Sequence, residues 1–120
     1  MLAVILFAHG ARDARWSLTL TELEARVRAR LPDAWVQAAF IEFQPPTLAT
    51  ALADALAAGA SRIALMPVFW ASGGHVAHDL PPLLEAFRRE HPDLALTVLP
   101  VISELPGLLD FIADAVAEQA

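Results

Sequence analysis

The chain has 120 residues, enough for a single domain spanning 1–120. Hydrophobic residues make up 57% of it, but no apolar run approaches the roughly 18 residues that are needed to span a bilayer. Its formal net charge of −6 at pH 7 argues against nucleic-acid binding, which draws most of its affinity from basic side chains. Because there is no cysteine, disulfides and thiolate metal sites are excluded, and any metal ion must be held by histidine and carboxylate side chains.

The first half of the chain predicts two strands and two helices. Leu2–Ala8 is an apolar run without a preceding basic segment, so it is predicted as a strand rather than a secretion signal, and the protein as cytoplasmic. A helix follows over about Ala14–Leu31, where apolar residues recur at steps of three and four. Trp35–Ile41 is the second strand. Pro46 and Thr47 start the next helix, and Gly59 suits its C-cap.

The second half repeats this alternation. Ile63–Phe69 is the third predicted strand. The helix after it is predicted to start with Asp79 as its N-cap and to end at His91. Leu94–Leu99 is the fourth strand and about Leu105–Glu118 the fourth helix.

Strict alternation of strands and helices predicts an α/β fold, a doubly wound four-stranded parallel sheet with helices on both faces. The high apolar content is expected to enter this sheet and a subunit interface. Such sheets bind ligands at the carboxyl ends of their strands, near the point where the strand order reverses. The candidate site is therefore expected at that edge.

Three of the predicted strands bring a metal-ligating side chain to this edge. His9 follows the first strand, Glu42 the second, and His75 and His78 the third. Imidazole and carboxylate ligands suit borderline divalent ions such as Co²⁺, Ni²⁺, Fe²⁺ or Zn²⁺. An incomplete protein ligand set leaves coordination positions open for exchange or chemistry.

Simpler interpretations exist for each of these side chains. His9 can serve a turn through a backbone hydrogen bond, and Glu42 can be a solvated acid or pair with Arg12. His78 can cap the third helix or lie in solvent, so its role as a ligand is left open. His91, at a helix end, suits a structural role, because a histidine there complements the helix dipole.

Several hydrolytic alternatives lack a required residue. Histidine phosphatases need an arginine directly before the His-Gly pair, where this chain has Ala8. The G-x-S-x-G elbow of α/β-hydrolases is absent, as are the P-loop and the G-x-G-x-x-G fingerprint. No nucleophile for a hydrolase is evident at the predicted edge.

Three segments together resemble the small CbiX-type chelatases. They are "HGARD" at 9–13, "AFIEFQPPTL" at 39–48 and "GASRIALMPVFWASGGHVAHDLP" at 59–81. This family comprises class II tetrapyrrole chelatases, which insert a divalent metal into sirohydrochlorin, and the resemblance extends over the whole chain in order. It implies a chelatase-like fold and, for a short member such as this, a homodimer.

The resemblance also implies roles for the residues at the edge. His9 and His75 match the family's metal-binding histidines, and Glu42 matches a glutamate that assists as ligand or base. Sirohydrochlorin carries eight carboxylates, so a cationic rim is needed, for which Arg12 and Arg15 are the candidates.

Other parts of the same loops are expected to contact the macrocycle. Gly73 and Gly74 are expected to permit a sharp turn or a close approach to a flat substrate before His75. Three aromatic residues near the rim are candidates for apolar walls of the site, although each can equally be a packing residue: Trp16, Phe69 and Trp70. One departure from the family pattern is Ala11, where serine is common.

The leading hypothesis is insertion of a divalent metal into sirohydrochlorin, with Co²⁺ first and Ni²⁺ or Fe²⁺ as alternatives, for cobalamin, F430 or sirohaem synthesis. The metal is a substrate, and no organic cofactor is expected. Neither nucleic acid nor a membrane is an expected partner. The alternative hypothesis is a metal chaperone or sensor that uses the same histidine pair without catalysis.

Overall fold

A computed structural model describes residues 1–71 and 73–120, with the side chains of Trp16, His75 and Val76 left out. It contains a four-stranded parallel sheet in the order β2-β1-β3-β4. The strands are β1 (Leu2–Ala8), β2 (Trp35–Phe40), β3 (Arg62–Pro67) and β4 (Ala95–Val98). The helices are η1 (Ala14–Ser17), α1 (Leu18–Arg30), α2 (Leu48–Ala57), α3 (Gly74–Glu90), η2 (Ile102–Glu104) and α4 (Leu108–Ala117).

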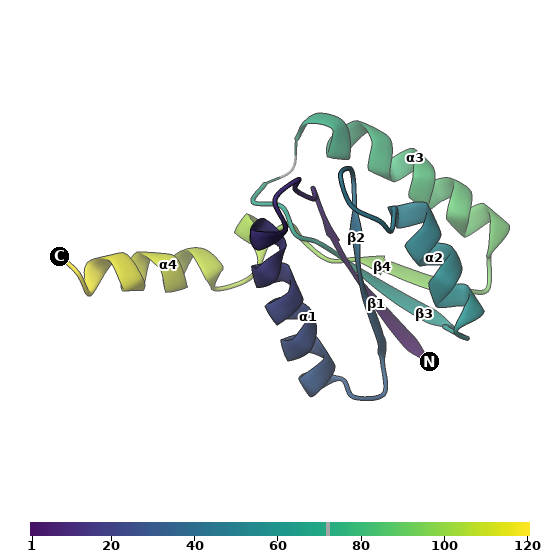
Figure 1. Cartoon of the computed structure of the whole chain (residues 1–120), viewed down its shortest axis with the longest axis horizontal. Helices are drawn as coiled ribbons and strands as arrows, with labels where there is room; N and C mark the ends of the chain where they lie inside the picture. The colour runs from purple at the N-terminus through teal and green to yellow at the C-terminus, as the bar shows by residue number, and fades with distance from the viewer. Residues whose placement is uncertain (72) are drawn as a thin grey trace.

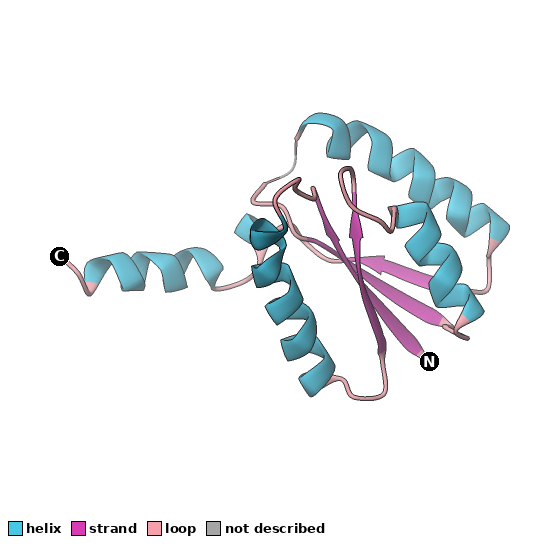
Figure 2. Ribbon diagram, in the orientation of Figure 1, coloured by secondary structure: helices cyan, strands magenta, loops and turns pink. Residues whose placement is uncertain are grey.

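The sheet is covered by helices on both faces, as the alternation of elements predicts (Figures 1 and 2). Side chains alternate between the two faces along each strand. In β1, Ala3, Ile5 and Phe7 enter the core under α2 and α3, whereas Val4 and Leu6 enter a smaller core under α1. The doubly wound parallel sheet is thus confirmed, and its two faces are unequally filled.

Local signals explain the boundaries of α2. The Thr47 side chain accepts a hydrogen bond from the backbone N–H of Thr50 at 3.2 Å, which satisfies one free donor of the first turn. Gly59, just beyond the helix, has a φ of 98°, in the left-handed region that ends many helices. The helix thus starts one residue after Thr47, and its C-cap is Ala58, one residue before the predicted Gly59.

The predicted start of the third helix is wrong. α3 begins at Gly74, so Asp79 lies within the helix and is not its N-cap, and Pro81 and Pro82 are inside it. A proline within a helix removes one backbone donor, but earlier turns remain possible because their own N–H groups are intact. His75 therefore belongs to the first turn of the helix rather than to a loop before it.

α4 departs from the expected arrangement of helices around a sheet. Its bounds match the predicted fourth helix closely, but none of its residues is buried. Figure 1 shows it extending away from the sheet, beyond α1 and η2. None of the helices in the described part of the chain combines the length and the apolar character needed to cross a membrane.

Candidate functional site

The strand order places a topological switch point between β1 and β3. From β1 the chain turns to α1 on one face, and from the neighbouring β3 it turns to α3 on the other. The two connections diverge and leave a crevice at the carboxyl ends of these strands. The loop after β1 therefore begins in the position where open α/β sheets bind ligands.

His9, the first residue after β1, lies in this crevice and is exposed. Its ring meets the ring of Phe69 edge-on, with centroids 4.7 Å apart and planes at 85°. Phe69 is itself only 6% exposed and packs edge-on against Phe7 at 5.6 Å. A buried aromatic pair thus supports the imidazole from within the protein, while the ring stays open to solvent.

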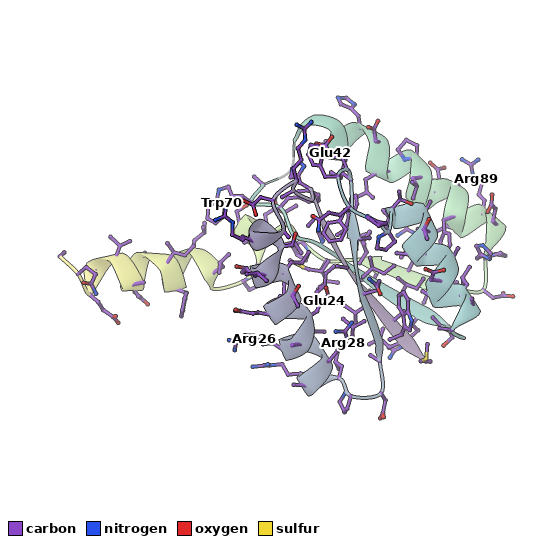
Figure 3. All side chains as sticks on the ribbon, in the orientation of Figure 1. Glu24, Arg26, Arg28, Glu42, Trp70 and Arg89 are labelled. Atoms are coloured by element: carbon purple, nitrogen blue, oxygen red, sulfur yellow. The ribbon has the colours of Figure 1, made fainter. Side chains whose placement is uncertain are left out.

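Glu42 is brought beside His9 by continued pairing of the chain beyond β1 and β2. The backbone N–H of Ile41 donates to the carbonyl of Ala8 at 3.0 Å, and that of Glu42 donates to the carbonyl of His9 at 3.1 Å. The Glu42 side chain is exposed and lies near the upper end of the sheet in Figure 3. The structure thus brings together two of the three predicted site residues.

Gly10 is required for this close approach. It has a φ of 88°, and a Cβ placed on it would collide with the carbonyl oxygen of Glu42. Only glycine combines that backbone conformation with the absence of a side chain. The His-Gly pair of the sequence is therefore a structural requirement of the rim as well as a chemical signature.

Gln44 was not predicted to belong to the site, yet it holds the loop that carries the arginines. Its Oε1 accepts hydrogen bonds from the backbone N–H of Ala11 at 2.8 Å and from the Ser17 hydroxyl at 3.0 Å. The loop after β2 therefore holds the loop after β1 at two points. The only sequence signal was the presence of an amide side chain two residues after the predicted site residue Glu42.

The third predicted site residue, His75, is in the first turn of α3, and its side chain lies outside the described residues. His78 follows in the same helix and is exposed. Of the preceding glycines, Gly74 has a φ of 57° and uses the left-handed region, whereas Gly73 has an extended backbone. Among the side chains that the structure describes, no three metal-ligating residues gather into a complete ion site.

The two arginines after His9 differ in their surroundings. The guanidinium of Arg12 lies over the ring of Phe43, with Cζ 4.8 Å from its centroid, so it stacks on an aromatic ring. Arg15 instead pairs with Asp13, donating from Nη2 to Oδ2 at 2.6 Å and from Nε to Oδ1 at 3.1 Å. These hydrogen bonds from Arg15 hold the pKa of the Asp13 carboxyl below its ordinary value.

The rim opens into a cleft of about 540 Å³ beside α1. The cleft reaches from His9 and Gly10 down to Val68 and the inner side of α1. Its volume lies within the roughly 300–1,000 Å³ of typical small-molecule sites. A predominantly apolar wall of this size beside an exposed imidazole suits a large, flat, partly apolar ligand.

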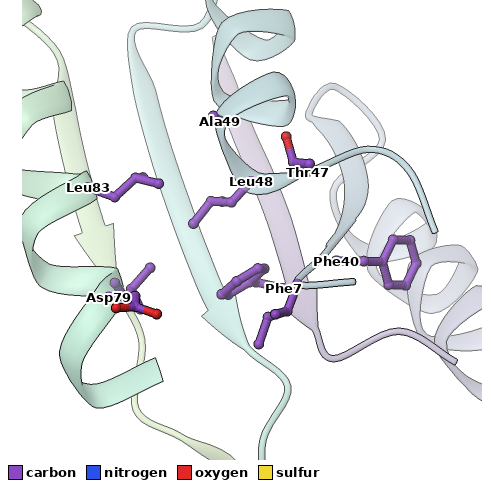
Figure 4. Close-up of a pocket in the computed structure, with 9 residues that line it drawn as sticks. Phe7, Phe40, Thr47, Leu48, Ala49, Asp79 and Leu83 are labelled. Atoms are coloured by element: carbon purple, nitrogen blue, oxygen red, sulfur yellow. The ribbon is translucent and has the colours of Figure 1, made fainter. Parts of the chain in front are cut away.

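A second cavity lies on the other side of the sheet, between α2 and α3 (Figure 4). Its volume is about 210 Å³, below the usual range for ligand sites, and its polar side chains are Thr47 and Asp79. Thr47 is already used as the cap of α2. We therefore assign the ligand site to the larger cleft.

The aromatic residues expected as walls of the site have separate roles. Phe69 is a packing residue beneath His9, as described above. Trp70 is 57% exposed and remains available for contact with a ligand. The side chain of Trp16 lies outside the described residues.

A model of the CbiX family matches residues 3–119. The chain belongs to the CbiX family. The resemblance noted in the three sequence segments is thereby confirmed, and the match extends over nearly the whole chain.

Individual relatives agree in length and fold. A protein of Methanococcoides burtonii named sirohydrochlorin cobaltochelatase is 32% identical, over 99% of this chain and 94% of that protein. The crystal structure of a CbiX protein from Marinobacter aquaeolei VT8 is 30% identical, with a TM-score of 0.78 over 99% of this chain and 97% of the other.

A third match shows the fold alone. SirB from Bacillus subtilis, solved with Fe³⁺, is 20% identical with a TM-score of 0.76. The match covers 99% of this chain but only 47% of SirB, so the chain spans about half the length of that protein.

Proposed function

We propose that this CbiX-family protein is a sirohydrochlorin chelatase that inserts a divalent metal ion into the macrocycle. The observation that carries the proposal is the exposed His9 at the switch point, supported by buried Phe69 and opening into the 540 Å³ apolar cleft. The prediction of an enzyme that acts on a tetrapyrrole is confirmed at the level of the family, whose curated relatives are named sirohydrochlorin cobaltochelatases.

Metal insertion exchanges cations within the macrocycle and involves no redox chemistry. The ion enters between the pyrrole nitrogens, and two N–H protons leave, so a divalent ion replaces two protons. The protein must present an ion with exchangeable ligands and accept the protons as they leave. Neutral imidazole performs both tasks at physiological pH.

In this proposal His9 and His75 hold the incoming metal, Glu42 accepts one of the two protons from the macrocycle, and the imidazole of a ligand histidine accepts the other once the metal has left it. His9 and Glu42 are joined through their backbones at 3.1 Å, so the two side chains leave adjacent points of one rim. A carboxylate beside the apolar macrocycle is partly desolvated on binding, which strengthens it as a base. Two ligands from the protein leave most coordination positions open for the pyrrole nitrogens.

The arrangement of charge supports an acidic substrate at the same rim. Arg12 stacks on Phe43 and offers its guanidinium edge to a carboxylate. Arg15 is already neutralised by Asp13. We therefore assign carboxylate binding to Arg12 first, with Arg15, Gly73 and Gly74 as further substrate contacts.

Cobalt is the metal we assign first, because the curated relatives bear the name cobaltochelatase. Ni²⁺ and Fe²⁺ fit the same ligand types. Which of the three metals is inserted determines whether the product serves cobalamin, F430 or sirohaem synthesis. We further propose that the protein acts in the cytoplasm, as a homodimer and without an organic cofactor.

The test is anaerobic incubation of sirohydrochlorin with Co²⁺, Ni²⁺ or Fe²⁺, followed through the Soret and visible absorption bands. Acceleration over the spontaneous rate by catalytic amounts of protein supports the proposal. No acceleration with any of the three metals contradicts it. If the protein binds metal without changing the absorption of the macrocycle, it is a chaperone or sensor instead.

Histidine variants test the ligand assignment in the same assay. Loss of a residue that only hydrogen-bonds to a metal ligand typically lowers metal affinity or activity roughly 10–100-fold. His9→Ala and His75→Ala each remove a proposed ligand itself, so each is expected to lower the insertion rate by more than that. His91→Ala is the control, because that ring packs on Phe87 at the far end of α3, with centroids 4.8 Å apart. If His78→Ala proves as damaging as His75→Ala, the assignment of the second ligand is wrong.

A further inference from the structure

Phe43 has a backbone conformation that its side chain disfavours. Its φ is 69°, and among the residues that the structure describes it is the single non-glycine residue with a positive φ. In this left-handed region the Cβ of an L residue crowds the following carbonyl oxygen, so glycine or asparagine is usual there and a bulky residue is strained. Strained residues of this kind gather at functional sites, where the surrounding structure holds them in place.

Phe43 is held from both sides. The N–H of Glu42 donates to the carbonyl of His9 at 3.1 Å, and the side chain of Gln44 accepts from the N–H of Ala11 at 2.8 Å. Both neighbours of Phe43 are therefore tied to the loop after β1, which lies beside them at the upper end of the sheet (Figure 1). The chain turns at Phe43 between these two anchors, so the strained conformation persists.

The strain is not offset by burial of the ring. Phe43 is 51% exposed, and it belongs to neither of the hydrophobic clusters found among the described residues. A glycine at this position would relieve the backbone without emptying any part of those clusters. The stability of the fold therefore does not explain an aromatic side chain here.

The ring instead contacts the guanidinium of Arg12. The Arg12 Cζ lies 4.8 Å from the ring centroid, within the roughly 6 Å of a cation–π contact. A guanidinium that stacks through its flat face keeps the N–H groups around its edge free to donate. Among the described residues it forms no ion pair, not even with Glu42, the carboxylate next to Phe43.

Arg12 differs in this respect from most arginines of the chain. Of the other two arginines whose side chains donate no hydrogen bond within the described part of the chain, Arg62 begins β3 and Arg26 is in the third turn of α1. Arg12 is thus the arginine with free donors in the loop that follows His9. The remaining five donate to protein oxygens: Arg15, Arg28, Arg30, Arg88 and Arg89.

We propose that Phe43 is a positioning residue for substrate carboxylates, whose ring holds the Arg12 guanidinium at the rim with its N–H edge free for the ligand. The inference rests on the proposed function, because the ligand it requires is a macrocycle that carries carboxylates. An exposed arginine has many rotamers, and holding it in place before binding lowers the entropy cost of ordering it. The strained backbone of Phe43 then serves binding rather than folding.

The first test measures affinity and stability on the same variants. Phe43→Gly removes both ring and strain, so it is expected to raise the dissociation constant for metal-free sirohydrochlorin about 2–5-fold while keeping or raising the urea midpoint. Phe43→Tyr keeps an aromatic ring and is expected to bind within about twofold of the original protein. Quenching of tryptophan fluorescence, measured anaerobically, gives the dissociation constants, and urea unfolding gives the midpoints.

Ile41→Ala is the matched control for these measurements. Ile41 is an exposed apolar residue of the same loop, but it lines the smaller cavity on the other side of the sheet, so its removal is expected to leave the dissociation constant unchanged. If Phe43→Gly binds as tightly as the original protein, or loses stability together with affinity, the proposal is wrong. An original protein that does not bind the macrocycle also overturns it.

A second test asks whether Phe43 acts through Arg12. Phe43→Gly added to Arg12→Gln is expected to raise the dissociation constant no further than Arg12→Gln does alone, because the ring then has no guanidinium to hold. Independent effects that multiply in the double variant would mean that the ring acts on the ligand by itself, which contradicts a positioning role.

Turnover separates this inference from the proposed function. In the insertion assay the loss in Phe43→Gly is expected in KM and not in kcat, the pattern of an interaction made equally with substrate and transition state. A fall in kcat with KM unchanged overturns the inference. If the original protein binds the macrocycle without accelerating insertion, the proposed function fails, while the binding measurements still decide the role of Phe43.

Discussion

Gly10 is the residue on which the closeness of the two rim loops depends. It lies between His9, which faces the cleft, and Ala11, whose N–H is held by Gln44. Its position after a strand was readable from the sequence, but its contact was not. Nothing in the pattern indicated that the carbonyl of Glu42 would occupy the place of its side chain.

Gly10→Ala is expected to destabilise the protein by more than Gly59→Ala. Both glycines have positive φ, 88° and 98°, and an L residue in that region costs roughly 1–2 kcal/mol. Only at Gly10 does the added Cβ also collide with backbone, whereas at Gly59 nothing lies within 4 Å. Urea unfolding of the two variants measures the difference in free energy of unfolding. Equal losses of stability would show that the two rim loops move apart at no energetic cost.

Arg12 and Arg15 were equivalent in the sequence and are not equivalent in the structure. Arg12→Gln is expected to raise KM for sirohydrochlorin by up to about fivefold, the range of an exposed ion pair. Arg15→Gln is expected to change KM less, because Asp13 already neutralises that guanidinium. Initial rates against substrate concentration give both values. A larger effect from Arg15→Gln would reverse the assignment of the carboxylate contact.

At the scale of the elements, the periodicity of the sequence located every strand to within two residues at each end. β1 is found at its predicted bounds, because a run buried on both faces is continuous and ends abruptly at His9. The start of α3 was misplaced because Asp79 before Leu80 and Pro81 has the composition of a cap. Composition at a helix start is local, whereas the actual start depends on the turn at Gly74.

The pairing of the two rim loops through Gln44 is testable by an isosteric change. Gln44→Ala is expected to lower the free energy of unfolding by about 1 kcal/mol, since two donors lose their shared acceptor. Gln44→Glu keeps an acceptor oxygen in the same place and is expected to lose less. Urea unfolding gives the stabilities. Hydrogen exchange at the Ala11 amide supplies a local readout, and unchanged exchange in Gln44→Ala would contradict the role of this side chain.

α3 carries His75 and is attached to the sheet through one side. Leu84 is 4% exposed and belongs to the main core, whereas its neighbour Leu83 is 36% exposed. Leu84→Ala is expected to cost about 2–5 kcal/mol, as for other buried leucines. Leu83→Ala is the control and is expected to cost clearly less. Thermal unfolding compares them, and similar losses would mean that the helix is held through a different side.

At the scale of the whole molecule, the sheet is covered by two helices on one face and one on the other. The sequence predicted α4 as a helix because its apolar residues recur with helical period. Periodicity shows that a helix has an apolar side, but not which surface covers that side. The expectation that the apolar excess would partly serve a subunit interface is still a prediction.

If the proposed homodimer contributes to stability, the thermal midpoint must depend on protein concentration. For a folded dimer that dissociates as it unfolds, each tenfold rise in concentration adds about 1.4 kcal/mol per dimer. Divided by the unfolding entropy of two such chains, this free energy corresponds to a rise in Tm of about 2–3 °C. Calorimetry over a hundredfold range of protein concentration is expected to show this slope. A midpoint independent of concentration would mean that a second copy contributes nothing to the stability of the fold.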